Sequence, residues 1–256
     1  AFDAWMERHR LAYATLIVVA ACFVLVLFVD LPLAIGLNSG AWVALGPAFR
    51  LIGELGRPEG FVAAAILLAL LAAWSAWRLD ARDRGPEAAW WRWVLRHCYL
   101  LFATLLSSTA LLHLLKQVVG RLRPRVWFSD GHYGLDWPFA GFPADSFPSG
   151  HTQVAFAVAV AIALAAPRWA LVVYLLAALV GLSRIVNEMH YLSDVVAAAF
   201  MVIALALLWK RWFLDPAARW PGTTPLAWPA LWRARRRRDP RGRQAAAKSS
   251  PASTRA

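Results

Sequence analysis

The sequence predicts an all-α integral membrane protein with six transmembrane helices. Hydrophobic residues make up 60% of its 256 residues, Trp occurs 15 times, and the mean hydropathy is +0.51. A soluble domain has about 45–50% apolar residues, so the composition indicates a membrane protein. The apolar residues also form six runs, each near the ~20 residues that a helix needs to cross the hydrocarbon core.

The first apolar run covers residues 11–29 and follows a short basic segment. The run is longer than the about 7–15 residues of a signal-peptide core and has no evident cleavage site, so we expect an uncleaved helix. Residues 30–60 contain several Pro and Gly and are expected to form a loop, with a short interfacial helix over 41–52. The second span is predicted over residues 61–77.

Residues 78–97 contain five Arg and three Trp, which is typical of a loop at a membrane surface. The third span, over residues 98–115, ends at Lys116, and a long polar loop follows over 120–148. The last three spans are predicted over residues 151–166, 169–186 and 190–209.

Residues 1–215 are expected to form the membrane domain, and residues 216–256 a basic, disordered tail. Twelve of the 27 Lys and Arg residues lie beyond residue 209, after the last apolar run. The net charge of +12 therefore does not indicate nucleic acid binding. The two Cys lie inside apolar runs and suggest no disulfide.

The distribution of basic residues predicts the topology. Six spans place both termini on one side, together with 20 of the 27 Lys and Arg residues. Basic residues beside membrane spans mark the cytoplasmic side, so the termini are expected in the cytoplasm. The segments 30–60, 116–148 and 184–190 then face the other side.

Three polar clusters stand at the ends of the apolar runs, all on this extracytoplasmic side. They are Lys116-x6-Arg123-Pro124, Pro148-Ser149-Gly150-His151 and Ser183-Arg184-x5-His190-x3-Asp194. Ionisable residues next to the hydrocarbon core are costly, which makes these clusters candidates for a functional site.

His190 and Asp194 are four residues apart, which places them on one face of a helix. There the carboxylate can accept a hydrogen bond from one ring nitrogen and leave the other nitrogen as nucleophile or base. Taken alone, such a pair is more often structural than catalytic.

Ser149, Gly150 and His151 stand where a loop meets a helix. The free N–H groups at a helix start favour an anion, Ser149 adds a hydroxyl donor, and His151 can supply a proton. The alternative is an ordinary helix start with Ser149 as the capping residue.

Lys116, Arg123 and Arg184 are cations suited to phosphoryl oxygens. For Lys116, a side chain reaching from the helix end toward the membrane surface is the alternative. The combined inventory suits phosphoryl transfer through a phosphohistidine, with one His attacking and the other protonating the leaving oxygen. No carboxylate cluster for a metal accompanies these residues, so neither metal nor cofactor is expected.

The three motifs, in this order and at every defining position, resemble the signature of the type 2 phosphatidic acid phosphatase (PAP2) superfamily. This resemblance implies a PAP2-like bundle of six membrane helices with its site facing away from the cytoplasm. It further implies that His190 is the nucleophile, oriented by Asp194, and that His151 is the general acid. The phosphate would be held by Lys116, Arg123, Ser149, Gly150 and Arg184.

Several polar residues stand outside these motifs. Arg121 and Arg125 are expected either to contact an acidic headgroup or to lie in solvent. His113, one turn before Lys116, is expected to be a packed helix residue, with support of the site as the alternative.

The function expected from these features is that of a metal-independent lipid phosphatase in the bacterial inner membrane. Its substrate would be phosphatidate, phosphatidylglycerophosphate or a lipid A 1-phosphate. An undecaprenyl diphosphate phosphatase is an alternative, although some of these enzymes carry Asp where this chain has Gly150. A non-hydrolytic phospholipid binder or transporter is another, and the membrane spans disfavour a halide-oxidising enzyme. The expected partner is the phosphorylated lipid and not nucleic acid, and the oligomeric state stays open.

Overall fold

The computed structural model describes residues 2–82 and 84–214, and within these residues every regular element is a helix. The predicted all-α fold class is therefore confirmed. Five of the described helices are long and apolar enough to cross a membrane, and a sixth apolar helix is shorter. The segment predicted to be a basic tail, residues 216–256, lies outside the described residues.

The six apolar helices correspond to the six predicted spans. They are α1 (Phe2–Phe28), α4 (Pro58–Asp80), α5 (Gly85–Val119), the shorter α7 (Gly150–Ala165), α8 (Ala170–Val186) and α9 (Leu192–Phe213). The short helices between them are α2 (Asp30–Leu37), α3 (Ala41–Glu54), α6 (Pro124–Asp130) and the 3₁₀ turn η1 (Pro167–Trp169).

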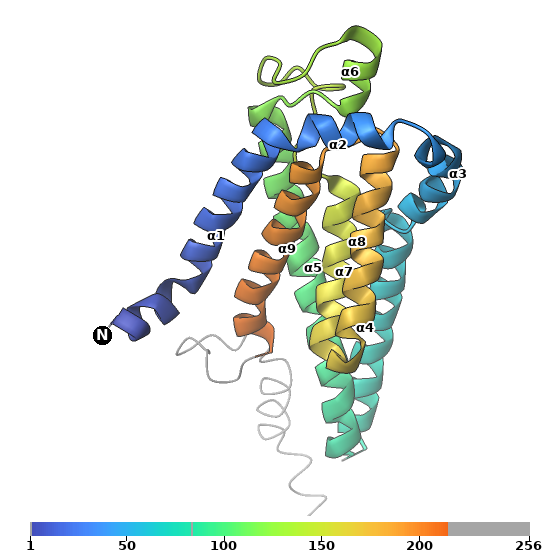
Figure 1. Cartoon of the computed structure of the whole chain (residues 1–256). Coiled ribbons are helices and arrows are strands. Elements are labelled where there is room, and N and C mark those ends of the chain that lie inside the picture. Colours follow the sequence, from blue (N-terminus) through green and yellow to red (C-terminus); the bar gives the residue numbers. More distant parts are fainter. Residues whose placement is uncertain (1, 83, 215–256) are drawn as a thin grey trace, which may run out of the picture. The chain divides into compact units, whose positions relative to one another are not determined.

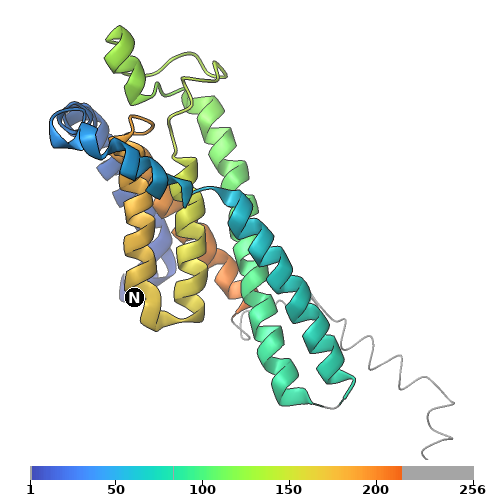
Figure 2. The same cartoon turned by 90° about the vertical axis from the view of Figure 1, so that its right-hand side faces the viewer.

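Small side chains bring the central helices close together. α7 packs against α5, α8 and α9, while α4 lies along α5 and α1 along α9 (Figures 1 and 2). Ala157 and Val202 are fully buried where α7 meets α9, beside Leu105 of α5. Gly181 of α8 lies so close to α9 that a Cβ there would stand 2.7 Å from Val195 Cγ1. Small residues let membrane helices approach in this way.

Large apolar side chains cover the outside of the bundle. Phe23 of α1, Leu67 of α4, Leu106 of α5 and Leu171 of α8 are each more than half exposed. Monomeric soluble proteins rarely expose apolar surface over so many elements, whereas lipid-facing helices do. The exposed surface thus agrees with the helix lengths in indicating a membrane protein.

The structure corrects the predicted loop over residues 78–97. α4 continues to Asp80 and α5 begins at Gly85, so most of this segment is helical. Pro86 stands in the first turn of α5, where its missing N–H costs no helical hydrogen bond. The 35 residues of α5 span about 52 Å at 1.5 Å per residue, well beyond the ~30 Å of hydrocarbon. Accordingly, Figure 2 shows α4 and α5 continuing past the α7–α8 turn.

Residues 30–60 were predicted as a loop but are mostly helical. α2 lies across the ends of α8 and α9, and α3 packs against α8 (Figure 1). The predicted short helix over 41–52 is confirmed as α3. α6, inside the predicted loop over 120–148, is a further helix that the sequence pattern did not reveal.

All three motifs lie at one end of the bundle. α5 and α8 end there, and α7 and α9 begin there (Figure 1). The start of α1 and the end of α9 lie at the opposite end. This alternation of helix direction brings residues from 116 to 194 within reach of one another.

Candidate active site

The three motifs contribute to one cavity of about 430 Å³ at this end of the bundle. Six of the eight predicted site residues line it, namely Lys116, Arg123, Gly150, His151, Arg184 and His190. The other two, Ser149 and Asp194, are fully buried and do not line the cavity.

His190 lies in the connection between α8 and α9, and not on a helix as its spacing from Asp194 suggested. Its backbone N–H donates to the carbonyl of Arg184 in the last turn of α8, at 3.2 Å. The α9 helix begins two residues later, at Leu192. The end of α8 therefore holds His190 in place and explains its spacing from Arg184.

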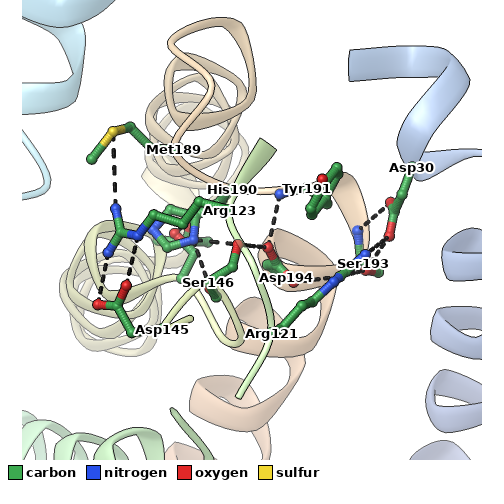
Figure 3. Close-up of polar contacts among 12 residues, drawn as sticks. Asp30, Arg121, Arg123, Asp145, Ser146, Met189, His190, Tyr191, Ser193 and Asp194 are labelled. Carbon is green, nitrogen blue, oxygen red and sulfur yellow. Dashed lines mark hydrogen bonds and ion pairs between the residues drawn. The ribbon is translucent and has the colours of Figure 1, made fainter. Parts of the chain in front are cut away.

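A backbone carbonyl fixes the tautomer of His190. Its Nδ1 lies 2.7 Å from the carbonyl oxygen of Ser146 (Figure 3). A carbonyl only accepts hydrogen bonds, so Nδ1 carries the proton and Nε2 keeps its lone pair. Burial lowers the pKa of His190 to about 4, against the opposing effect of Asp194, so the ring is neutral at ordinary pH. A neutral imidazole with a free Nε2 is a nucleophile.

Asp194 does not bond the ring directly, which corrects the predicted His190–Asp194 hydrogen bond. Its Oδ2 lies 3.8 Å from Nδ1, too far for a hydrogen bond. Oδ2 instead accepts from the Ser146 hydroxyl at 2.6 Å and from the backbone N–H of Tyr191 at 2.8 Å. Ser146 thus links the two residues, because its carbonyl contacts His190 and its hydroxyl contacts Asp194 (Figure 3).

Arg121 was expected to contact a headgroup or to lie in solvent. In the structure it is buried behind the site instead. Its guanidinium donates to Asp194 Oδ1 at 2.6 Å and to Asp30 Oδ2 at 2.8 Å (Figure 3). It also stacks over the Tyr191 ring, 4.3 Å from the ring centre. Burial alone would lower the pKa of Arg121, but Asp194 and Asp30 raise it above its usual range. The guanidinium is therefore a fixed cation.

Asp30 joins the start of α9 to the end of the first span. Its carboxylate accepts from the backbone N–H of Ser193 at 3.0 Å and from the Ser193 hydroxyl at 2.5 Å. A carboxylate that bonds the N–H groups of a first turn stabilises a helix start. Asp30, Arg121 and Asp194 thus form a buried chain of charges that fixes the position of the α9 N-terminus.

Two of the predicted phosphate-binding cations share a carboxylate. Arg123 Nε and Nη2 donate to the two oxygens of Asp145 at 2.7 and 2.8 Å (Figure 3). Lys116 Nζ donates to the backbone carbonyl of Asp145 and lies 3.9 Å from its Oδ2. Burial would raise the pKa of Asp145, but Arg123 and Lys116 together hold it below its usual value. Asp145 is therefore ionised.

Arg184, the third cation, has no carboxylate partner among the described residues. Its Nε is buried without a hydrogen bond. Gly53 of α3 packs against it, since a Cβ there would lie 3.1 Å from Arg184 Nη1. Arg184 is thus placed by packing at the cavity and keeps its hydrogen-bonding capacity for a ligand.

The start of α7 brings its backbone N–H groups to the cavity. Ser149 makes no capping bond to this helix. Its hydroxyl instead accepts from Thr152 at 2.9 Å, and its N–H donates to the Asp194 carbonyl at 3.2 Å. The alternative of an ordinary cap by Ser149 is therefore wrong. Uncapped N–H groups at a helix start suit an anion.

His151 stands where the turn between α3 and α4 comes close to α7. A Cβ at Gly56 would lie 2.7 Å from His151 Cβ and 2.9 Å from Val180 Cγ1, so only Gly fits at this contact. The His151 ring lines the cavity and makes no hydrogen bond within the described part of the chain. It is free to contact a ligand.

The rest of the cavity is largely apolar. Its lining includes Val62, Leu105, Leu112 and Val154, from α4, α5 and α7. His113 also lines it and is exposed, so it is not the packed helix residue that was expected. The polar end and the apolar wall together suit a ligand with an anionic head and a hydrocarbon part.

Asp30, Asp145 and Ser146 were not predicted as part of the site, and Arg121 was predicted to lie elsewhere. The one available signal was for Asp30, a lone acid at the end of a 19-residue uncharged run. Asp145 and Ser146 stand within three residues of the Pro148 motif, but no residue pattern there marks them as part of the site.

Comparison with known proteins finds similarity to one family over the part of the chain that holds the motifs. The model of the PAP2 superfamily matches residues 96–217, a stretch that contains all three motifs. A crystal structure of a transmembrane PAP2-type phosphatidylglycerolphosphate phosphatase from Bacillus subtilis superposes with a TM-score of 0.55. The superposition covers 80% of this chain and 96% of that one at 18% identity, so it shows a shared fold.

Three curated relatives are named lipid A 1-phosphatase. The Rhizobium etli protein is 39% identical over 98 residues, 38% of this chain and 42% of the relative. The Rhizobium johnstonii protein is 35% identical over 116 residues, 43% of this chain and 47% of the relative. The Porphyromonas gingivalis protein is 39% identical over 85 residues, 32% of this chain and 19% of the relative. The matches thus span less than half of each relative. In its motifs, its helical fold and these matches, the chain is similar to members of the PAP2 superfamily.

Proposed function

We propose that the protein is an integral membrane phosphatase that removes a phosphate from a membrane lipid through a phosphohistidine on His190. The observation that carries this proposal is the free Nε2 of a neutral His190 in a cavity that also holds Lys116, Arg123 and Arg184. A binding protein needs the cations but has no use for an imidazole with a fixed tautomer.

In the first step, the Nε2 lone pair attacks phosphorus and a P–N bond forms. The bond from phosphorus to the lipid oxygen breaks, and His151 gives its proton to that oxygen as the lipid leaves. The three cations and the N–H groups at the start of α7 stabilise the charge on the equatorial oxygens. Asp194 acts through Ser146 and supports the orientation of His190.

In the second step, water attacks the phosphohistidine and gives a proton to His151. The P–N bond breaks, inorganic phosphate forms, and His190 returns to its neutral state. Side chains supply the positive charge around the cavity, and the one carboxylate that lines it in the described part of the chain, Asp145, is paired with Arg123. Activity is therefore proposed to be metal-independent.

The proposed substrate is a lipid phosphomonoester of the lipid A 1-phosphate, phosphatidate or phosphatidylglycerophosphate type. The names of the three curated relatives make lipid A 1-phosphate the first to test. The apolar wall of the cavity suits the lipid part. The excess of basic residues near the termini supports an inner-membrane location with the site facing the periplasm.

The test is phosphate release by purified protein in detergent from a panel of lipid A, phosphatidate, phosphatidylglycerophosphate and undecaprenyl diphosphate. We expect hydrolysis of at least one lipid, its loss in His190→Ala, inhibition by orthovanadate, and no effect of EDTA. Binding of these lipids without release of phosphate would instead establish a non-hydrolytic binder. Loss of activity with EDTA and recovery with a metal would contradict the metal-free mechanism.

A further inference from the structure

A carboxylate of the protein already occupies the place where phosphate would bind Arg123. Asp145 presents both oxygens to Arg123 Nε and Nη2, at 2.7 and 2.8 Å. This two-point pairing is the geometry in which a guanidinium holds two oxygens of a phosphoryl group. Asp145 lines the cavity, and its side chain is 25% exposed. A ligand phosphate and the Asp145 carboxylate therefore compete for the same donors.

The backbone on either side of Asp145 is held in place. Ala144 N–H donates to the Gly141 carbonyl at 2.6 Å, and Ser146 N–H donates to the Arg121 carbonyl at 2.9 Å. The Asp145 carbonyl accepts from Lys116. The carboxylate can thus leave Arg123 by rotation of its own side chain, while the loop that positions His190 through Ser146 stays fixed.

The charges around the cavity make this displacement costly for a small anion. Asp145 brings one negative charge among the three site cations, and among the described residues it is the one carboxylate that lines the cavity. Compared with a cavity that lacks this carboxylate, an entering phosphate is attracted less strongly by the cations that Asp145 neutralises, and it is repelled by the carboxylate itself. A lipid phosphate also gains the contact of its hydrocarbon part with Val62, Leu105 and Leu112.

We propose that Asp145 is a specificity-determining residue that weakens binding of phosphate anions lacking an apolar part. Inorganic phosphate and water-soluble phosphomonoesters then bind poorly, whereas an amphiphilic phosphate displaces the carboxylate from Arg123. Asp145 also promotes release of the phosphate product. The role of Asp145 in substrate specificity rests on the proposed function, whereas its competition with phosphate for Arg123 concerns binding alone.

The test compares Asp145→Asn with wild type and with Asp130→Asn. Asn keeps the shape of Asp145 and one acceptor for Arg123 but removes the charge. Asp130 is an exposed acid in the same inter-helix segment, does not line the cavity, and its replacement changes the net charge equally. Binding of inorganic phosphate and of orthovanadate is measured by calorimetry, and kcat/KM is measured for glycerol 3-phosphate, which lacks an apolar part, and for the lipid substrate.

We expect Asp145→Asn to bind inorganic phosphate at least about tenfold more tightly, because a unit charge near the ligand is removed. The ratio of its kcat/KM for lipid to its kcat/KM for glycerol 3-phosphate falls by a similar factor, and Asp130→Asn matches wild type. Asp145→Ser, which also removes the carboxylate, shows the same direction of change and serves if the Asn variant does not fold.

Equal or weaker phosphate binding by both Asp145 variants would overturn the proposal, because that is the result for a residue that only positions Arg123. The binding assay needs no turnover, so the two proposals fail separately. Tighter phosphate binding without hydrolysis of any lipid would retain the competition at Arg123 and remove the proposed function. Hydrolysis of a lipid together with unchanged phosphate affinity of the Asp145 variants would retain the proposed function and remove the competition at Arg123.

Discussion

Replacing Arg121 with Met is expected to destabilise the protein strongly, although this residue does not line the cavity. The guanidinium bridges Asp30 and Asp194, whose side chains are both fully buried. Removing one partner of a buried ion pair typically costs about 3–5 kcal/mol, because a charge stays buried without compensation. Here one substitution leaves two such carboxylates, so we expect a loss at the upper end of this range.

Unfolding of purified protein by SDS titration, followed by circular dichroism, measures this loss. Arg168→Met is the matched control, because Arg168 is an exposed cation on η1 and its loss should change stability by no more than about 0.5 kcal/mol. Adding Asp30→Asn to Arg121→Met removes one of the unpaired charges and should restore part of the stability. Equal stabilities of the Arg121 and Arg168 variants would show that Arg121 does not stabilise the fold by compensating the buried carboxylates of Asp30 and Asp194.

Two further predictions concern the site itself. His190 is buried in its neutral form with a pKa lowered to about 4 from 6.5, so the folded state binds fewer protons than the unfolded state between these values. The difference in free energy of unfolding between wild type and His190→Gln should therefore keep its full value above pH 6.5 and decrease as the pH falls toward 4. Parallel pH dependence of the two melting temperatures would contradict this. Gly56→Ala should lower kcat about 100-fold by pushing His151 out of position, whereas Gly60→Ala, with no atom within 4 Å of the added Cβ, should stay within about twofold. Similar rates for these two Ala variants would show that the contact at Gly56 does not position His151.

The helical fold could be predicted from sequence because it depends on local pattern. Each membrane span is an uninterrupted apolar run, and its length is set by the thickness of the bilayer. The limits of α5 could not be predicted from hydropathy, because its first turns carry Arg and Trp yet are helical. α2 was missed because an eight-residue helix shows too few turns for a clear period.

Six of the residues that line the cavity could be predicted, because their motifs stand at the ends of spans that alternate in direction. The supporting contacts could not, because they join segments far apart in the chain. Arg121 and Asp30 are 91 residues apart, and their pairing depends on how α2 lies across the bundle. The replacement of Asp194 by the Ser146 carbonyl as partner of His190 follows from the path of the loop before α7. No spacing rule encodes that path.

The most direct test of the account is a search for the phosphoenzyme. Purified protein is mixed rapidly with lipid substrate carrying radiolabelled phosphate, quenched in alkali, digested and mapped by mass spectrometry. We expect an acid-labile, alkali-stable phosphate on the peptide that contains His190, because its Nε2 is the proposed nucleophile in the cavity. Label on His151, or full turnover by His190→Ala without any phosphoenzyme, would contradict it.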